Sequence, residues 1–200
     1  MQLKTKMIVG SLASLVLLST VLILGWQYSD KIADQQYEDA VLNGRSALWK
    51  KIISQEYAKM KGESKRVKRN KKVIEGISIG QNDVVTEYAL YDYNGLSGAG
   101  FITNLSLTNS TGKIVFSAEK AAPNQYAAAT DYVLKKSKVR YDVVIDLNGN
   151  AELIYAFPLY FKRKVIGVGV FAKSLEKAVA DFAKSTGTTA YILTTRAKKC

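Results

Sequence analysis

An uncharged run of twenty residues near the N-terminus, from Met7 to Trp26, constrains the fold of this 200-residue chain most strongly. A helix over this run would be ~30 Å long, which matches the hydrocarbon core of a membrane. A cleaved signal peptide is the alternative, but it would have a shorter apolar region and an A-x-A cleavage site. A buried core helix would rarely be apolar on every side. The run therefore predicts an uncleaved transmembrane anchor over residues 7–26.

The charges that flank this run predict its orientation. Lys4 and Lys6 precede it, whereas residues 27–42 contain four acidic side chains and one basic side chain. Because basic residues tend to stay on the cytoplasmic side of a membrane, we expect residues 1–6 in the cytoplasm and the rest of the chain outside. Trp26 suits the outer interface between membrane and water.

The composition excludes several kinds of catalytic and metal site. The chain has no histidine, and its single cysteine is the last residue, Cys200. Disulfides within the chain, zinc sites of the Cys/His type and catalytic triads that need histidine are therefore excluded. No paired-carboxylate motif stands out, so we expect no catalytic residue, metal or cofactor, and a protein that is not an enzyme.

A long helix is predicted over residues 27–75, because this stretch has no proline and only two glycines. Within it, Ile53, Met60, Val67 and Ile74 recur every seven positions, as apolar residues do in a coiled coil. This spacing predicts a homodimer that pairs two parallel copies of the helix. The alternative is that the same residues face the sheet of their own chain.

Most of the net charge of +12 lies in residues 43–81, which overlap the second half of this helix. Residues 43–81 contain eleven basic and three acidic side chains, and residues 59–72 alone contain eight basic ones. Such a run would suit an anionic lipid, a nucleic acid or simply a solvated helix face. No aromatic residues lie between the basic ones to stack on bases, which argues against nucleic acid and favours a solvated face.

Residues 76–195 predict an α+β core. Helices are expected over 84–95, 130–137 and 174–187, and strands are expected in a hairpin over 100–120 and over 141–146, 151–161, 164–172 and 188–195. Successive strands joined by short turns indicate an antiparallel sheet, with helices against at least one face. The chain is thus expected to comprise an anchor, a long stalk helix, this core and a short end, residues 196–200.

Two stretches of this core resemble Cache domains, the PAS-like outer sensors of bacterial methyl-accepting chemotaxis proteins, histidine kinases and diguanylate cyclases. They are "LSLTNSTGKIVFS" (residues 105–117) and "YAFPLYFKRKVIGVGVFAKSLEKAVADFAKSTGTTAYIL" (residues 155–193). The resemblance extends over residues 27–195. It implies a PAS-like sensor of a small molecule, held on the periplasmic side of a bacterial inner membrane.

The chain departs from the Cache family in two respects. The amino-acid-binding branch pairs an Arg-Trp-Tyr stretch with a later Asp, and this sequence has no such stretch. Members also continue into a second membrane helix and a cytoplasmic signalling module, which residues 196–200 cannot form. We therefore expect the sensor part of a receptor, either as a truncation or as the product of a degenerate gene. A membrane-tethered protein that binds an anionic polymer or partner through its basic helix is the alternative, and an anchored hydrolase is a third interpretation.

Two glycines, Gly167 and Gly169, lie on one face of a predicted strand. Glycine is unusual inside a sheet because it packs nothing and loses backbone entropy. The pair leaves either a gap for a small ligand or room for the close approach of a helix or an aromatic ring. If the ligand is a carboxylate, Arg140 is the best candidate for its cationic donor. The candidate ligand-binding residues are Tyr126, Tyr132, Arg140, Tyr141, Asp142, Tyr155, Phe157, Gly167 and Gly169.

Overall fold

The computed structural model describes residues 2–118, 125–145 and 149–190, with side chains of the first helix given mainly from residue 36 onward. The chain divides into two compact units, Met1–Leu48 and Trp49–Cys200. Helix α1 (Gln2–Arg69) provides the described part of the first unit and enters the second. Among the described residues, no helix is long and apolar enough to cross a membrane. The predicted anchor over residues 7–26 lies almost wholly outside the described side chains, and it stays a prediction.

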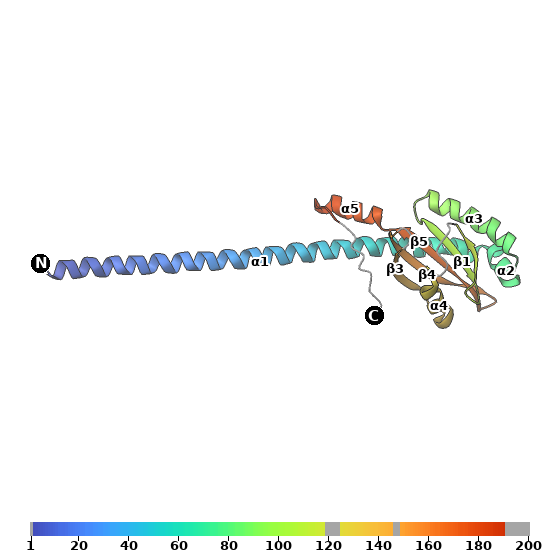
Figure 1. The fold of residues 1–200 in the computed structure, drawn as a ribbon, viewed down its shortest axis with the longest axis horizontal. Helices are drawn as coiled ribbons and strands as arrows, with labels where there is room; N and C mark the ends of the chain where they lie inside the picture. Colours follow the sequence, from blue (N-terminus) through green and yellow to red (C-terminus); the bar gives the residue numbers. More distant parts are fainter. Residues whose placement is uncertain (1, 119–124, 146–148, 191–200) are drawn as a thin grey trace. The chain divides into compact units, whose positions relative to one another are not determined.

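The second unit is an α+β domain, as the sequence predicts (Figure 1). Its remaining helices are α2 (Lys71–Ile79), α3 (Asn82–Gly98), α4 (Ala127–Lys136) and α5 (Glu176–Thr186). Its strands are β1 (Asn104–Asn109), β2 (Ile114–Ser117), β3 (Arg140–Ile145), β4 (Ala151–Phe161) and β5 (Lys164–Ser174). All neighbouring strands pair antiparallel, in the order β2-β1-β5-β4-β3.

The long helix ends earlier than the sequence predicts, at Arg69 rather than near residue 75. The Asn70 side chain accepts a hydrogen bond from the backbone N–H of Val73 at 3.3 Å and so caps a new helix, α2. At the other end of the chain, residues 188–190 do not form the start of the predicted last strand, and residues 191–195 lie outside the described residues.

The two faces of the sheet pack against different helices. On the face toward α1, α2 and α3, here called the α1 face, the core contains Leu105, Leu107, Leu153, Tyr155, Phe157, Leu159 and Phe171. On the opposite face, here called the α4 face, it contains Ile154, Ala156, Val168, Val170 and Ala172. Helix α4 packs over β3, β4 and β5 on that face (Figure 1). Strands β4 and β5 are therefore buried on both faces, whereas alternate residues of the edge strand β3 stay exposed.

The seven-residue spacing in α1 serves the protein's own core. Met60 and Val67 are fully buried and Ile74 is nearly so, all in the cluster on the α1 face, and Ile53 packs against that cluster. These side chains cover the sheet of their own chain, which was the alternative to a coiled-coil seam. A homodimer that pairs two copies of α1 stays a prediction, and the pairing would involve the residues before Trp49.

Candidate functional site

A row of polar side chains lies on the α4 face of β1, an interior strand. Asn104, Ser106 and Thr108 point to this face and are buried, whereas Leu105 and Leu107 alternate with them on the α1 face. Burying polar groups costs free energy unless they find hydrogen-bond partners. A sheet face needed only for packing would carry apolar residues at these positions, as β4 and β5 do.

A cavity of about 500 Å³ lies over this polar row, beside α4. Five hydroxyl-bearing side chains line it, namely Ser106, Thr108, Thr111, Tyr126 and Thr130. Its charged lining residues are Asp131 on α4 and Lys113 in the turn between β1 and β2. Its volume falls within the range of pockets that hold small molecules. We refer to it below as the hydroxyl cavity.

The turn between β1 and β2 forms one rim of the hydroxyl cavity. The Asn109 side-chain oxygen accepts hydrogen bonds from the backbone N–H groups of Thr111 and Lys113, both at 3.0 Å. Gly112 adopts a φ of 83°, which glycine tolerates without strain, and a Cβ there would contact Leu134 of α4 at 3.7 Å. The turn is therefore held in shape by its own side chain and lies close to α4.

A buried hydrogen-bond network holds Tyr126 in the wall of the cavity. The Tyr126 hydroxyl donates to Glu152 Oε2 at 3.0 Å and accepts from Asn104 Nδ2 at 3.3 Å. Gln125 Nε2 donates to the same Glu152 oxygen at 2.9 Å. Because these partners come from β1, β4 and the start of α4, the network ties the cavity wall to the sheet.

Of the nine candidate ligand-binding residues, Tyr126 alone lines the hydroxyl cavity. Arg140 and Asp142 lie on the same face, but on β3, and β4 and β5 separate them from β1. Arg140 Nη2 pairs with Asp142 Oδ2 at 2.6 Å, and its guanidinium lies 5.3 Å from the centre of the Tyr132 ring. Arg140 therefore contacts both Asp142 and Tyr132, a residue of α4, and none of the three lines the hydroxyl cavity.

The other candidates lie on the α1 face, where no gap remains at Gly169. A Cβ on Gly169 would lie 2.5 Å from two atoms of the Phe157 ring, and one on Gly167 would overlap the Thr108 carbonyl oxygen. The glycines therefore permit close approach of an aromatic ring and of a neighbouring strand. Tyr141, Tyr155 and Phe157 stack in series, with centroids 5.1 and 5.4 Å apart.

A lysine of α1 covers this aromatic series. Lys68 Nζ lies 4.7 Å from the centre of the Phe157 ring and 3.5 Å from the Tyr155 hydroxyl. Burial, together with the charge of nearby Lys61, lowers the pKa of Lys68 below its usual value. An ammonium over aromatic faces is a cation–π contact, so this part of the basic run stabilises the core.

Sequence reasoning missed the hydroxyl cavity, although one signal for it was present. The alternation of Asn104, Ser106 and Thr108 with leucines is visible in the sequence. That pattern ordinarily predicts a strand with one solvated face. Only the packing of α4 and the turn beside that face reveals that the polar row lines a cavity.

Comparison with known proteins finds similarity in structure alone. No protein-family profile matches the chain, and no curated protein matches it in sequence. The sensor domain of the Vibrio cholerae histidine kinase DctB aligns with a TM-score of 0.54 and 12% identity, over 74% of this chain and 60% of that one. The periplasmic domain of Vibrio cholerae LuxQ aligns with a TM-score of 0.52 and 10% identity, over 72% of this chain and 70% of that one. At such identities the likeness concerns the fold, and this chain spans about three fifths of the DctB domain.

Proposed function

Because the chain has the fold of the Cache-type sensor domains, we propose that it is the small-molecule sensor of a bacterial membrane receptor and that the hydroxyl cavity binds its ligand. The observation that carries the proposal is the cavity over a buried polar row on the α4 face. A binding role suits this lining, which offers several hydrogen-bonding groups to a small molecule.

The lining of the cavity favours a small polar ligand without excess negative charge. The hydroxyls of Thr108, Thr111 and Tyr126 already donate to groups of the protein and can only accept from a ligand. Those of Ser106 and Thr130 can donate as well, so the lining can satisfy a hydroxyl, amide or amino group. One carboxylate, on Asp131, and one ammonium, on Lys113, nearly balance in charge. Arg140, expected as the donor for an anionic ligand, pairs with Asp142 instead. An uncharged or zwitterionic molecule fits this chemistry best.

The proposal places the domain outside the membrane, held by the anchor over residues 7–26, with the helix before Trp49 joining two copies. Ligand binding then acts by favouring one of two arrangements of the domain, to the extent that the ligand binds them unequally. The output module of such a receptor would lie outside this sequence. The alternative, binding of an anionic polymer along the basic run, is less well supported, because Arg66 and Lys68 at its centre contact the protein's own Asp92 and Phe157.

We expect a reporter enzyme that works only in the periplasm to be active when it is fused after residue 190. The reason is the uncharged run preceded by Lys4 and Lys6. A cytoplasm-only reporter fused at the same position serves as the control and should be inactive. Activity of that control reporter would contradict the proposed orientation.

We expect Thr130→Val to lower the affinity of the hydroxyl cavity for its ligand at least about tenfold, because the substitution removes a hydroxyl and keeps the side-chain shape. A panel of small polar molecules is screened by thermal unfolding of the full chain in detergent. Ligand at a hundred times its dissociation constant should stabilise the domain by ~2.7 kcal/mol. Affinity is then compared between the two proteins by calorimetric titration.

The matched control for this test is Thr86→Val. Thr86 is an exposed residue of α3 whose hydroxyl donates to the Asn82 carbonyl at 2.9 Å, outside the hydroxyl cavity. This variant should bind the ligand as the unmodified protein does. Equal affinity of the Thr130 and Thr86 variants for the ligand would mean that the ligand binds outside the hydroxyl cavity.

A further inference from the structure

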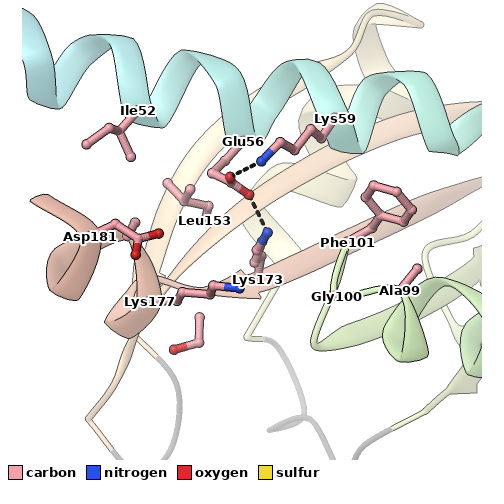
Figure 2. Close-up of a pocket in the computed structure, with 12 residues that line it drawn as sticks. Ile52, Glu56, Lys59, Ala99, Gly100, Phe101, Leu153, Lys173, Lys177 and Asp181 are labelled. Atoms are coloured by element: carbon pink, nitrogen blue, oxygen red, sulfur yellow. Dashed lines mark hydrogen bonds and ion pairs between the residues drawn. The ribbon is translucent and has the colours of Figure 1, made fainter.

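A second cavity, of about 260 Å³, lies on the α1 face of the sheet. Residues of α1, of the connection between α3 and β1, of the end of β5 and of α5 surround it (Figure 2). Ile52, Phe101 and Leu153 give it apolar walls, and five charged side chains also line it. The sheet separates it from the hydroxyl cavity, so its role does not depend on the proposed sensor site.

Three ammonium groups, those of Lys59, Lys173 and Lys177, line this cavity. Glu56 accepts a hydrogen bond from Lys59 at 2.7 Å and another from Lys173. Burial alone would raise the pKa of Glu56, but the hydrogen bonds and charges of the two lysines lower it below its usual value. The carboxylate is therefore ionised at neutral pH, and two cations share it.

Lys173 is the most enclosed of the three lysines. Its side chain is only 13% exposed, and Glu56 is its single hydrogen-bond acceptor within the described part of the chain. An ammonium carries three N–H donors, so two remain for a further partner. Enclosing a charged donor without acceptors is costly, which makes the space beside Lys173 favourable for an anion.

Lys177 adds a second positive charge to the same space. It lies in the first part of α5, and Figure 2 shows its side chain extending from the helix toward Lys173. Asp181, one turn further along α5, also lines the cavity. With two carboxylates against three ammonium groups, the lining keeps an excess of one positive charge.

We propose that this cavity binds a small oxyanion, a carboxylate or a phosphate, between Lys173 and Lys177. The ammonium groups would donate charge-assisted hydrogen bonds to its oxygens, and the apolar wall would accept a short aliphatic tail. Because Lys173 belongs to β5 and Lys177 to α5, with Lys59 of α1 also at the rim, the bound anion would link α5 to the sheet and to α1. Occupancy of this site would thereby regulate how firmly α5 is held.

The test titrates inorganic phosphate and, separately, propionate into the full chain in detergent, with chloride used to keep the ionic strength constant. Thermal unfolding should show a saturable rise in the midpoint temperature with at least one of the two anions. Saturation by phosphate alone or by propionate alone would identify which oxyanion the site accepts. No saturable rise with either anion would overturn the proposal.

Lys177→Gln should lower the affinity for the anion, obtained from the saturable rise in midpoint temperature, at least about tenfold, because it removes one of the two donors. Lys184→Gln is the matched control, since it removes the same charge from an exposed position of α5 outside the cavity. The control should retain the affinity of the unmodified chain. If the two variants respond alike, the anion effect is a general consequence of the positive net charge and the proposed site is wrong.

Discussion

Asp92→Ala is expected to lower the free energy of unfolding by about 3 kcal/mol, one of the two largest effects anticipated for a single substitution here. Asp92 lies on α3 and is only 4% exposed. Its Oδ1 accepts from Arg66 Nε at 3.0 Å, and its Oδ2 accepts from Asn70 Nδ2 at 2.8 Å. Because Asn70 also caps α2, the carboxylate joins three helices, and alanine would leave the donors of Arg66 and Asn70 without it.

Urea unfolding of the full chain, followed by near-ultraviolet circular dichroism, measures this loss. Asp83→Ala is the control, because Asp83 is an exposed acidic residue in the first turn of the same helix. It should cost less than about 1 kcal/mol, the usual value of a favourable charge at a helix N-terminus. Similar losses in the two variants would mean that Asp92 does not hold the helices together.

Gly169→Val is expected to destabilise the domain by about 3 kcal/mol, through overpacking of the α1 face. A Cβ at this position would lie 2.5 Å from the far end of the Phe157 ring. The ring is itself fully buried and packs edge-on against Phe171, with centroids 5.1 Å apart. It therefore cannot move aside without disturbing its neighbours.

A double-mutant cycle tests this cause directly. Phe157→Leu removes the outer part of the ring and should cost stability by itself. In its presence, the penalty of Gly169→Val should fall by at least about 1 kcal/mol, since contacting residues couple to this extent. Additive losses would show that the ring does not limit what fits at residue 169.

The sequence predicts the secondary structure of the sheet well, because the signals for its strands are local. Strands β4 and β5 occupy the predicted ranges closely, and Leu153, Tyr155 and Phe157 share one face with Gly169, as period two requires. Helix α5 ends at Gly187, which adopts the left-handed conformation expected at that position. The break at Asn70 could not be predicted in the same way, because it depends on a side-chain cap within a run of good helix formers.

The candidate site was harder to predict, because tertiary packing decides what each face of the sheet meets. Period two places Gly169 and Tyr155 on one face but does not say that α1 fills the space above them. In the same way, the sequence alone predicts a solvated face at Ser106 and Thr108, and only the tertiary structure shows that α4 and the β1–β2 turn form a cavity over it. Several of the residues predicted from the sequence to bind the ligand are aromatic, whereas the lining of the hydroxyl cavity consists largely of hydroxyl-bearing side chains.

The most direct test of the central claim, that the hydroxyl cavity binds the ligand, is a methyl NMR titration of the full chain in detergent. Threonine, isoleucine and leucine methyl groups are labelled, and spectra are recorded as a ligand from the screen is added to saturation. We expect the largest shifts at the methyl groups of Thr108 and Thr130, which line the cavity, while Ile52 and Leu153 on the α1 face stay nearly unchanged. Shifts confined to Ile52 and Leu153, with Thr108 and Thr130 unaffected at saturation, would contradict the claim.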